Sequence, residues 1–224
     1  MSSTATYELI DQVAVITMDD GKANAFSPDM IAAVNAQLDR AEAEAKAIVL
    51  TGRDGIFSGG FDLRVIRGDD PQAAVDMRLG GTRLMMRLYG LPLPFVIAAS
   101  GHAIALGAFC LLTADYRIGT AGEFRIGLNE TSLGMSLPPF GLMLARERLS
   151  KRHLSRATMA AAMFSPSGAQ DAGFLDAAVT KEELRNAALA VATSYSELDG
   201  GAYAAVKQGL RGEAIEEILA GLAS

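Results

Sequence analysis

One acidic residue, Glu130, lies among apolar and small residues between two glycines, in the stretch Ile126-Gly127-Leu128-Asn129-Glu130-Thr131-Ser132-Leu133-Gly134. A carboxylate in apolar surroundings loses hydration, which raises its pKa towards values useful for removing a proton at neutral pH. Glu130 is therefore a candidate general base. The alternative from this stretch alone is a loop glutamate that faces solvent or accepts hydrogen bonds, because strongly perturbed acids are the exception.

Two loops rich in small residues could supply hydrogen-bond donors beside such a base. In the first, Ser58-Gly59-Gly60 permits a tight turn that would direct the N–H of Phe61 into a cavity. In the second, the N–H groups around Leu106 and Gly107 begin an apolar helix, where first-turn donors are unpaired. Two converging donors would form an oxyanion hole, which stabilises an enolate as its charge develops. Taken singly, each loop is equally a turn or an ordinary helix start.

Other site chemistries have little support in the sequence. The single cysteine, Cys110, lies in an apolar segment without a neighbouring cation or base, so we expect a small buried hydrophobe. The histidines, His102 and His153, are far apart and show no metal-ligand spacing, and we predict no metal site. Neither the serine-hydrolase G-x-S-x-G motif nor a G-x-G-x-x-G or P-loop phosphate motif occurs.

The composition indicates a soluble globular protein with one substantial core, because 50% of its 224 residues are hydrophobic and 21% are charged. The net charge of -6 argues against nucleic acid as a partner. The apolar runs are far shorter than the ~20 residues that cross a membrane, so we expect no membrane partner. The short polar N-terminus is unlike a signal peptide, and with one cysteine it favours the cytoplasm.

Hydrophobic periodicity and capping residues predict alternating strands and helices up to Val179, followed by helices alone. This order predicts an α/β fold with a core over residues 1–180 and a helical section over 181–224. The expected strands are Tyr7 to Ile10, Val13 to Met18, Ala47 to Thr51, Phe95 to Ala99, Tyr116 to Ile118 and Phe174 to Val179. The expected helices are Pro28 to Ala45, Pro71 to Leu88, Leu106 to Ala114, Pro138 to Leu149, Ser150 to Ala162, Lys181 to Tyr195, Ala202 to Leu210 and Glu213 to Leu222.

Three segments, in order, resemble the crotonase (enoyl-CoA hydratase/isomerase) superfamily. They are Gly21-Lys22-Ala23-Asn24-Ala25-Phe26, Phe57-Ser58-Gly59-Gly60-Phe61-Asp62-Leu63, and the segment from Gly101 to Asp115. The resemblance covers nearly the whole chain, and the combination is far more specific than any one segment. It implies a crotonase-like spiral of ββα units with a helical C-terminal trimerisation section, hence a homotrimer or a dimer of trimers. The chain ends earlier than is usual for the family, so we expect some C-terminal contacts to be missing.

The same resemblance implies the roles of particular residues. It places the oxyanion donors on the N–H groups of Phe61 and Leu106, the loops that the residue types had already indicated. The substrate would be an acyl-CoA thioester, with no cofactor beyond the CoA moiety itself. The CoA would bind at Lys22, Ala23, Asp62, Leu63 and Arg64, with Lys22 or Arg64 near phosphate. An acyl pocket is expected from Met85, Phe109, Met135, Leu137 and Phe140, for which core packing is an equal alternative.

The acids distinguish branches of this superfamily. Its hydratases use two glutamates to activate water, and Phe109 stands at the first of these positions while Glu130 stands at the second. Phenylalanine cannot deprotonate water, whereas moving a proton between two carbons needs one base and a dry site. The runs Gly127-Leu128-Asn129-Glu130-Thr131 and Ala114-Asp115-Tyr116-Arg117-Ile118 resemble the mitochondrial-type Δ3,Δ2-enoyl-CoA isomerases in particular, and this resemblance favours Δ3 to Δ2 isomerisation. The alternatives are a hydratase, a thioester hydrolase, a dehalogenase, or a catalytically silent CoA-binding assembly protein.

Overall fold

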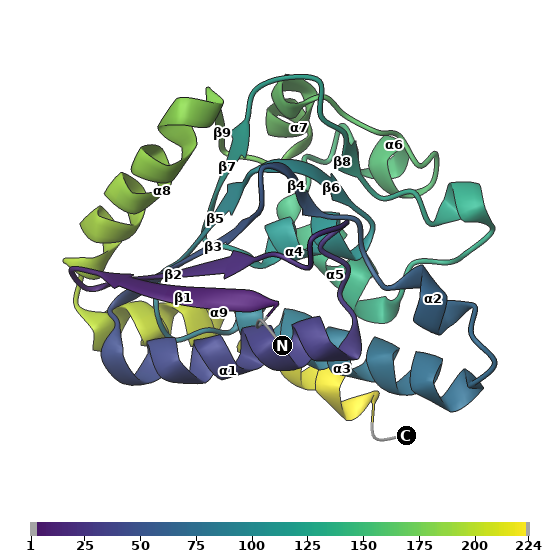
Figure 1. The fold of residues 1–224 in the computed structure, drawn as a ribbon, viewed down its shortest axis with the longest axis horizontal. Helices are drawn as coiled ribbons and strands as arrows, with labels where there is room; N and C mark the ends of the chain where they lie inside the picture. The colour runs from purple at the N-terminus through teal and green to yellow at the C-terminus, as the bar shows by residue number, and fades with distance from the viewer. Residues whose placement is uncertain (1–3, 223–224) are drawn as a thin grey trace.

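The computed structural model describes residues 4–222 and contains a six-stranded sheet in the order β1-β2-β3-β5-β7-β9 (Figure 1). Strand β1 pairs with β2 in an antiparallel hairpin, and every other pairing in this sheet is parallel. The α/β class predicted from the sequence is therefore confirmed. The strands are β1 (Ala5–Ile10), β2 (Val13–Met18), β3 (Ala47–Gly52), β5 (Phe95–Ala99), β7 (Tyr116–Thr120) and β9 (Ala177–Val179).

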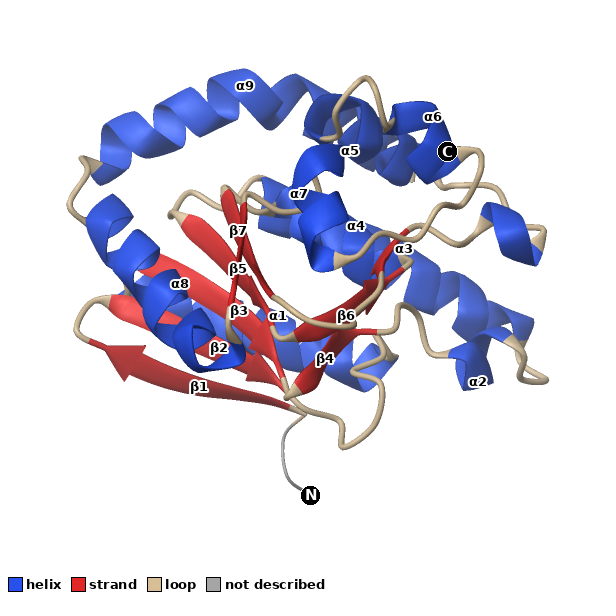
Figure 2. Cartoon of the chain, turned by 90° about the horizontal axis from the view of Figure 1, so that it is seen from above, coloured by secondary structure: helices blue, strands red, loops and turns tan. Residues whose placement is uncertain are grey.

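Helices cover both faces of this sheet, so its central strands are apolar on both sides. Helix α8 lies over one face of the sheet and α1 over the other (Figure 2). Alternate side chains of β3 point to opposite faces, because Ile48 and Leu50 belong to the main core, whereas Val49 packs in a second cluster with side chains of α8. The main core includes side chains of α1 (Pro28–Glu44), α3 (Pro71–Tyr89), α4 (Leu106–Thr113) and α5 (Pro139–Arg148). Helix α8 (Lys181–Ser196) begins at the predicted capping box of Thr180 and Glu183.

A second, smaller parallel sheet contains β4 (Gly55–Ser58), β6 (Gly101–Ile104) and β8 (Ile126–Gly127). Each of these strands directly follows a strand of the larger sheet and leads into a helix. This repetition of two strands and a helix is the ββα spiral expected from the family resemblance. None of these three short strands is among the strands expected from the sequence, because each is too short to show a period of two residues.

Several other element boundaries differ from the predictions. The helix expected from Ser150 to Ala162 is only α6 (Leu154–Thr158), and α7 (Pro166–Ala172) was missed. The two short helices expected after Gly200 are one helix, α9 (Gly200–Ala220), which Gly212 does not interrupt. Glycine lowers helix stability by only about 1 kcal/mol, so packing of the flanking turns is enough to carry the helix through it. No helix in the described part of the chain is long and apolar enough to cross a membrane.

A buried ionic cluster holds α9 against the core. The carboxylate of Asp115 accepts a hydrogen bond from Lys207 Nζ at 2.6 Å and forms an ion pair with Arg211 Nη1 at 2.9 Å. The two cations also donate to main-chain carbonyls, Lys207 to Leu93 and Arg211 to Tyr89. Because every member has a partner, the cluster offsets much of the cost of removing these charges from water. It fixes α9 beside α3 and α5.

Candidate active site

The small sheet brings the three predicted catalytic segments together. Phe61, Leu106 and Glu130 each lie within three residues of the end of β4, β6 or β8, respectively. The three strands are parallel neighbours, so their carboxyl ends lie along one edge of the sheet. Segments that are distant in the sequence are therefore adjacent at this edge.

The first loop is held by the Gly21 to Phe26 segment. The buried side chain of Asn24 donates to Met18 O at 2.9 Å, and Asn24 O accepts from Ser58 Oγ at 2.7 Å. The N–H of Phe26 in turn donates to Gly60 O at 2.8 Å. The Asn-Ala motif that carried the family resemblance thus supports the Ser58 to Phe61 turn, a structural role that the sequence analysis had not assigned to Asn24.

The two donor loops are in close contact. Gly60 has a φ of +97°, which side chains other than glycine rarely adopt. A Cβ atom on Gly60 would lie 3.0 Å from Ala105 Cβ and 3.4 Å from Leu106 N. Within residues 4–222, the N–H groups of Phe61 and Leu106 donate no hydrogen bond to another protein group. Two free donors consequently lie on adjoining loops.

The backbone before Leu106 is strained. Ala105 has a φ of +53° and a ψ of -121°, a conformation that is costly for alanine. Its N–H donates to Gly127 O at 3.0 Å, which connects the second loop to the strand that leads to Glu130. The contact between loops therefore holds Ala105 in a shape that exposes the N–H at the start of α4.

Glu130 is buried, with 8% of its surface exposed, and its Oε2 atom has no hydrogen-bond partner among the described residues. Burial raises the pKa of this carboxyl group above its ordinary value. Its main-chain oxygen accepts from the N–H groups of Leu133 and Met135, which curls the following loop back towards it. The neighbouring Asn129 Oδ1 is also buried, with no hydrogen-bond partner in the part of the chain that the structure describes. Glu130 is thus a desolvated acid rather than the solvated loop residue of the alternative interpretation.

The residues expected to bind CoA lie beside the first loop. Asp62 caps the short helix α2 (Leu63–Ile66), and its carboxylate accepts from Arg64 Nη2 at 2.7 Å. This hydrogen bond lowers the pKa of Asp62, and the nearby charge of Lys22 lowers it further. Lys22, Leu63 and Arg64 are exposed together, and Ala23 accepts a hydrogen bond from Gly59. Lys22, Ala23, Leu63 and Arg64 are therefore exposed beside the first loop, whereas Asp62 is buried.

The expected acyl-pocket residues are divided between core and surface. Phe109 and Phe140 are buried and meet edge to face, with ring centroids 5.5 Å apart. A Cβ atom on Gly141 would lie 2.6 Å from the Phe109 ring, so the ring fills the space between α4 and α5. Met85 is fully buried and Leu137 packs against the same core, whereas Met135 is 41% exposed. Phe109 is thus a tightly packed apolar side chain of the core.

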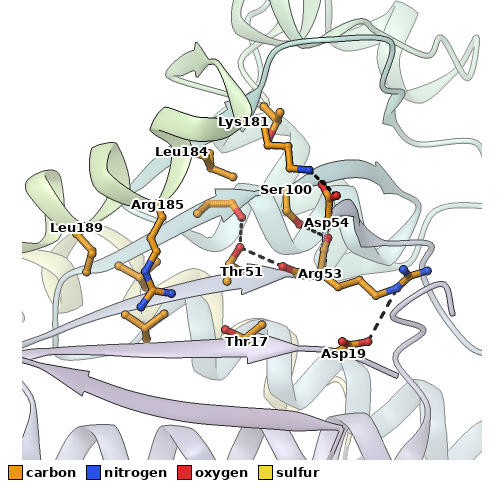
Figure 3. A pocket seen from close by; sticks show the side chains of 15 residues that line it. Thr17, Asp19, Thr51, Arg53, Asp54, Ser100, Lys181, Leu184, Arg185 and Leu189 are labelled. Carbon is orange, nitrogen blue, oxygen red and sulfur yellow. Dashed lines mark hydrogen bonds and ion pairs between the residues drawn. The ribbon is translucent and has the colours of Figure 1, made fainter. Parts of the chain in front are cut away.

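A pocket lies under α8, on the face of the large sheet away from the main core. Its lining includes none of Phe61, Leu106 and Glu130. Figure 3 shows this cavity of about 360 Å³ between α8 and strands β2, β3 and β5. Its charged groups are already paired, Lys181 with Asp54 and Arg185 with Glu8, and Thr51 donates to Ala98 O. Nothing in its lining calls for a ligand.

The other titratable residues considered, Cys110 and His102, do not form a further candidate site. Cys110 is fully buried, which raises the pKa of its thiol strongly. His102 Nδ1 accepts from the N–H of Arg125, and its ring meets the Phe124 ring edge to face. Among the described residues, no group of three or more His, Cys, Asp or Glu side chains could hold a metal ion.

The fold and these segments define a class: α/β spirals in which two free backbone donors and a buried carboxylate follow neighbouring parallel strands. A family model described as enoyl-CoA hydratase/isomerase matches residues 8–221, and the chain belongs to this family. The chain is 32% identical over 182 residues to human mitochondrial enoyl-CoA delta isomerase 1, covering 79% of this chain and 60% of that protein.

Solved structures give the same assignment. An enoyl-CoA hydratase/isomerase family protein from Pseudomonas syringae is 45% identical, with a TM-score of 0.94 over 97% of this chain and 94% of that one. A Mycobacterium tuberculosis protein, described as an enoyl-CoA isomerase for one solved structure and as a probable enoyl-CoA hydratase for another, is 39% identical, with a TM-score of 0.94 over 100% of this chain and 97% of the first structure's chain. The crotonase fold predicted from the sequence is therefore confirmed.

Proposed function

We propose that the protein shifts the double bond of a 3-enoyl-CoA thioester to the 2-position. Glu130 would take a proton from C2, and the electrons would form a dienolate whose charge lies on the thioester oxygen. The N–H groups of Phe61 and Leu106 would stabilise that oxygen, and Glu130 would return the proton to C4. One base therefore serves both steps, with no net gain or loss of atoms.

The observation that carries this proposal is a buried Glu130 carboxylate with a free oxygen in a chain that has Phe109 on helix α4. The raised pKa makes Glu130 a stronger base towards carbon. Phe109 is 1% exposed and packed against Phe140, so it offers neither a second acid nor a place to hold an attacking water. The isomerase names of two of the relatives support the same reaction.

Replacement of Glu130 by glutamine tests the assignment. A general base contributes about 10²- to 10⁴-fold, so Glu130→Gln should lower isomerisation of trans-3-enoyl-CoA by at least ~100-fold. Binding of the thioester should persist, because the amide is nearly isosteric. Near wild-type turnover would contradict the proposal. In deuterated water, mass analysis of the product gives a second readout, since a proton shared with solvent leaves deuterium at C2 or C4.

The main alternative within the family is another thioester chemistry, and one substrate panel separates the cases. Release of free CoA would indicate a hydrolase, release of halide a dehalogenase, and a 3-hydroxyacyl product a hydratase. A protein that binds CoA but turns over none of these substrates would be a silent assembly protein. The CoA itself is proposed to lie along Lys22, Ala23 and Asp62 to Arg64, with Lys22 or Arg64 near phosphate.

The oligomeric state is also a proposal. We infer a homotrimer or a dimer of trimers, assembled through the helical section over 181–224, from the family resemblance. Exposed apolar side chains along and before α9 support it: Leu198, Val206 and Leu210, of which Leu210 is 78% exposed. Light scattering on the purified protein tests the state, and a monomer would contradict it. Location in the cytoplasm stays a prediction.

A further inference from the structure

Helix α3 contains two adjacent glycines in its interior, Gly80 and Gly81. Glycine in a helix interior lowers helix stability compared with alanine, so we compared the space around the two positions for a reason why each lacks a side chain. A Cβ atom on Gly80 would lie 3.8 Å from the nearest atom of Ile31, which is ordinary contact. A Cβ atom on Gly81 would lie 2.5 and 2.7 Å from two atoms of the Phe61 ring. Gly81, unlike Gly80, therefore leaves no room for a side chain unless the Phe61 ring moves.

The ring that Gly81 admits belongs to a proposed donor residue. Phe61 is partly buried against the main core, and its ring rests directly on the backbone of α3. The same absent Cβ would lie 3.5 Å from Leu106 Cδ2, so the side chains of both donor residues meet at Gly81. The side chains of Phe61 and Leu106, one from each donor loop, thus both pack against α3 at Gly81.

We propose that Gly81 is a positioning residue for the two backbone donors, an inference that rests on the proposed function. A side chain at position 81 forces the Phe61 ring away from α3. The ring is joined to the Phe61 Cα through a single Cβ atom, so we expect its displacement to shift the backbone that carries the N–H of Phe61 relative to that of Leu106. Oxyanion stabilisation depends on donor position to within a fraction of an ångström, because the donors act on charge that exists only as the reaction proceeds.

Three variants test this role: Gly81→Ala, the matched control Gly80→Ala, and the double variant Gly81→Ala with Phe61→Leu. Loss of one oxyanion donor costs about 10²- to 10³-fold in kcat. We expect displacement by Gly81→Ala to lower kcat for trans-3-enoyl-CoA at least ~10-fold with little change in KM. Gly80→Ala should raise the melting temperature and leave kcat unchanged. Leucine keeps the N–H but removes the ring, so the double variant should recover most of the lost kcat.

The outcomes separate this inference from the reaction itself. Equal kcat for Gly81→Ala and Gly80→Ala, or a double variant that recovers nothing, would overturn the role of Gly81. If Gly81→Ala does not fold, the double variant must fold, because the clashing ring is gone; failure of both also overturns the proposal.

A second measurement does not need turnover. Acetoacetyl-CoA has an acidic C2, and its enolate absorbs in the near ultraviolet, so its absorbance on binding reports the two donors. A wild type that forms this enolate but does not isomerise 3-enoyl-CoA would refute the isomerase and leave Gly81 to be tested by the absorbance, which Gly81→Ala should reduce. A wild type that does neither would refute both.

Discussion

The Glu130→Gln variant should be more stable than the wild type at neutral pH, and the gain should disappear in acid. Glu130 is buried with a free Oε2, and burial raises its pKa in the folded protein. Between the unfolded pKa of about 4.3 and the raised folded value, the folded state binds more protons than the unfolded state. Stability contributed by the protonated carboxyl is thus full below the unfolded pKa and is lost as the pH rises through the folded pKa.

The magnitude follows from the charge that Glu130 carries when it is ionised, because glutamine at this position is also polar and buried. A buried polar group without a partner costs about 1–3 kcal/mol, and more when it is charged. Glutamine has the same shape without the charge, so Glu130→Gln should recover at least ~1 kcal/mol at pH 8. For a chain of 150–250 residues this corresponds to a rise of roughly 2–4 °C in the melting temperature.

Thermal unfolding followed by circular dichroism at pH values from 4 to 8 measures this difference. The matched control is Glu123→Gln, because Glu123 is exposed and its carboxylate is hydrated in both states. The gap between Glu130→Gln and wild type should widen with rising pH, while the control stays parallel to wild type. A gap that is the same at pH 4 and pH 8, or a variant less stable than wild type at pH 8, would show that Glu130 is not a desolvated base.

Two further substitutions test the supporting structure. Asp115→Asn removes the anion between Lys207 and Arg211. It should lower the free energy of unfolding, measured with denaturant, by about 3–5 kcal/mol, because two cations remain buried. The control Asp54→Asn, at an exposed ion pair, should leave the unfolding midpoint unchanged. Phe109→Glu should raise hydration of 2-enoyl-CoA above background by supplying a second carboxylate, and should lower the melting temperature because it replaces a packed ring. A folded Phe109→Glu protein with no hydration would mean that Phe109 is not what blocks that reaction.

Much of this protein follows from local sequence. The long helices α1, α3 and α8 carry their own capping residues, Ser27, Asp70 and Thr180, so their start points could be predicted without tertiary contacts. The central strands β2, β3 and β5 of the large sheet are buried on both faces and show as nearly continuous apolar runs. Glu130 also stood out locally, as one acid among apolar and small residues.

Tertiary structure decided what local sequence could not express. Strands β4, β6 and β8 have four, four and two residues, too few for a periodic signal, and they form only because they pair with one another. Helix α9 also depends on tertiary contacts. It continues through Gly212 because Asp115 holds the side chains of Lys207 and Arg211.

The burial of Glu130 and the meeting of Phe61 with Leu106 over Gly81 depend on side chains that lie far apart in the sequence. Residue types determined which groups could react. The small sheet decided that they lie at one edge, because only the pairing of parallel strands brings their carboxyl ends together.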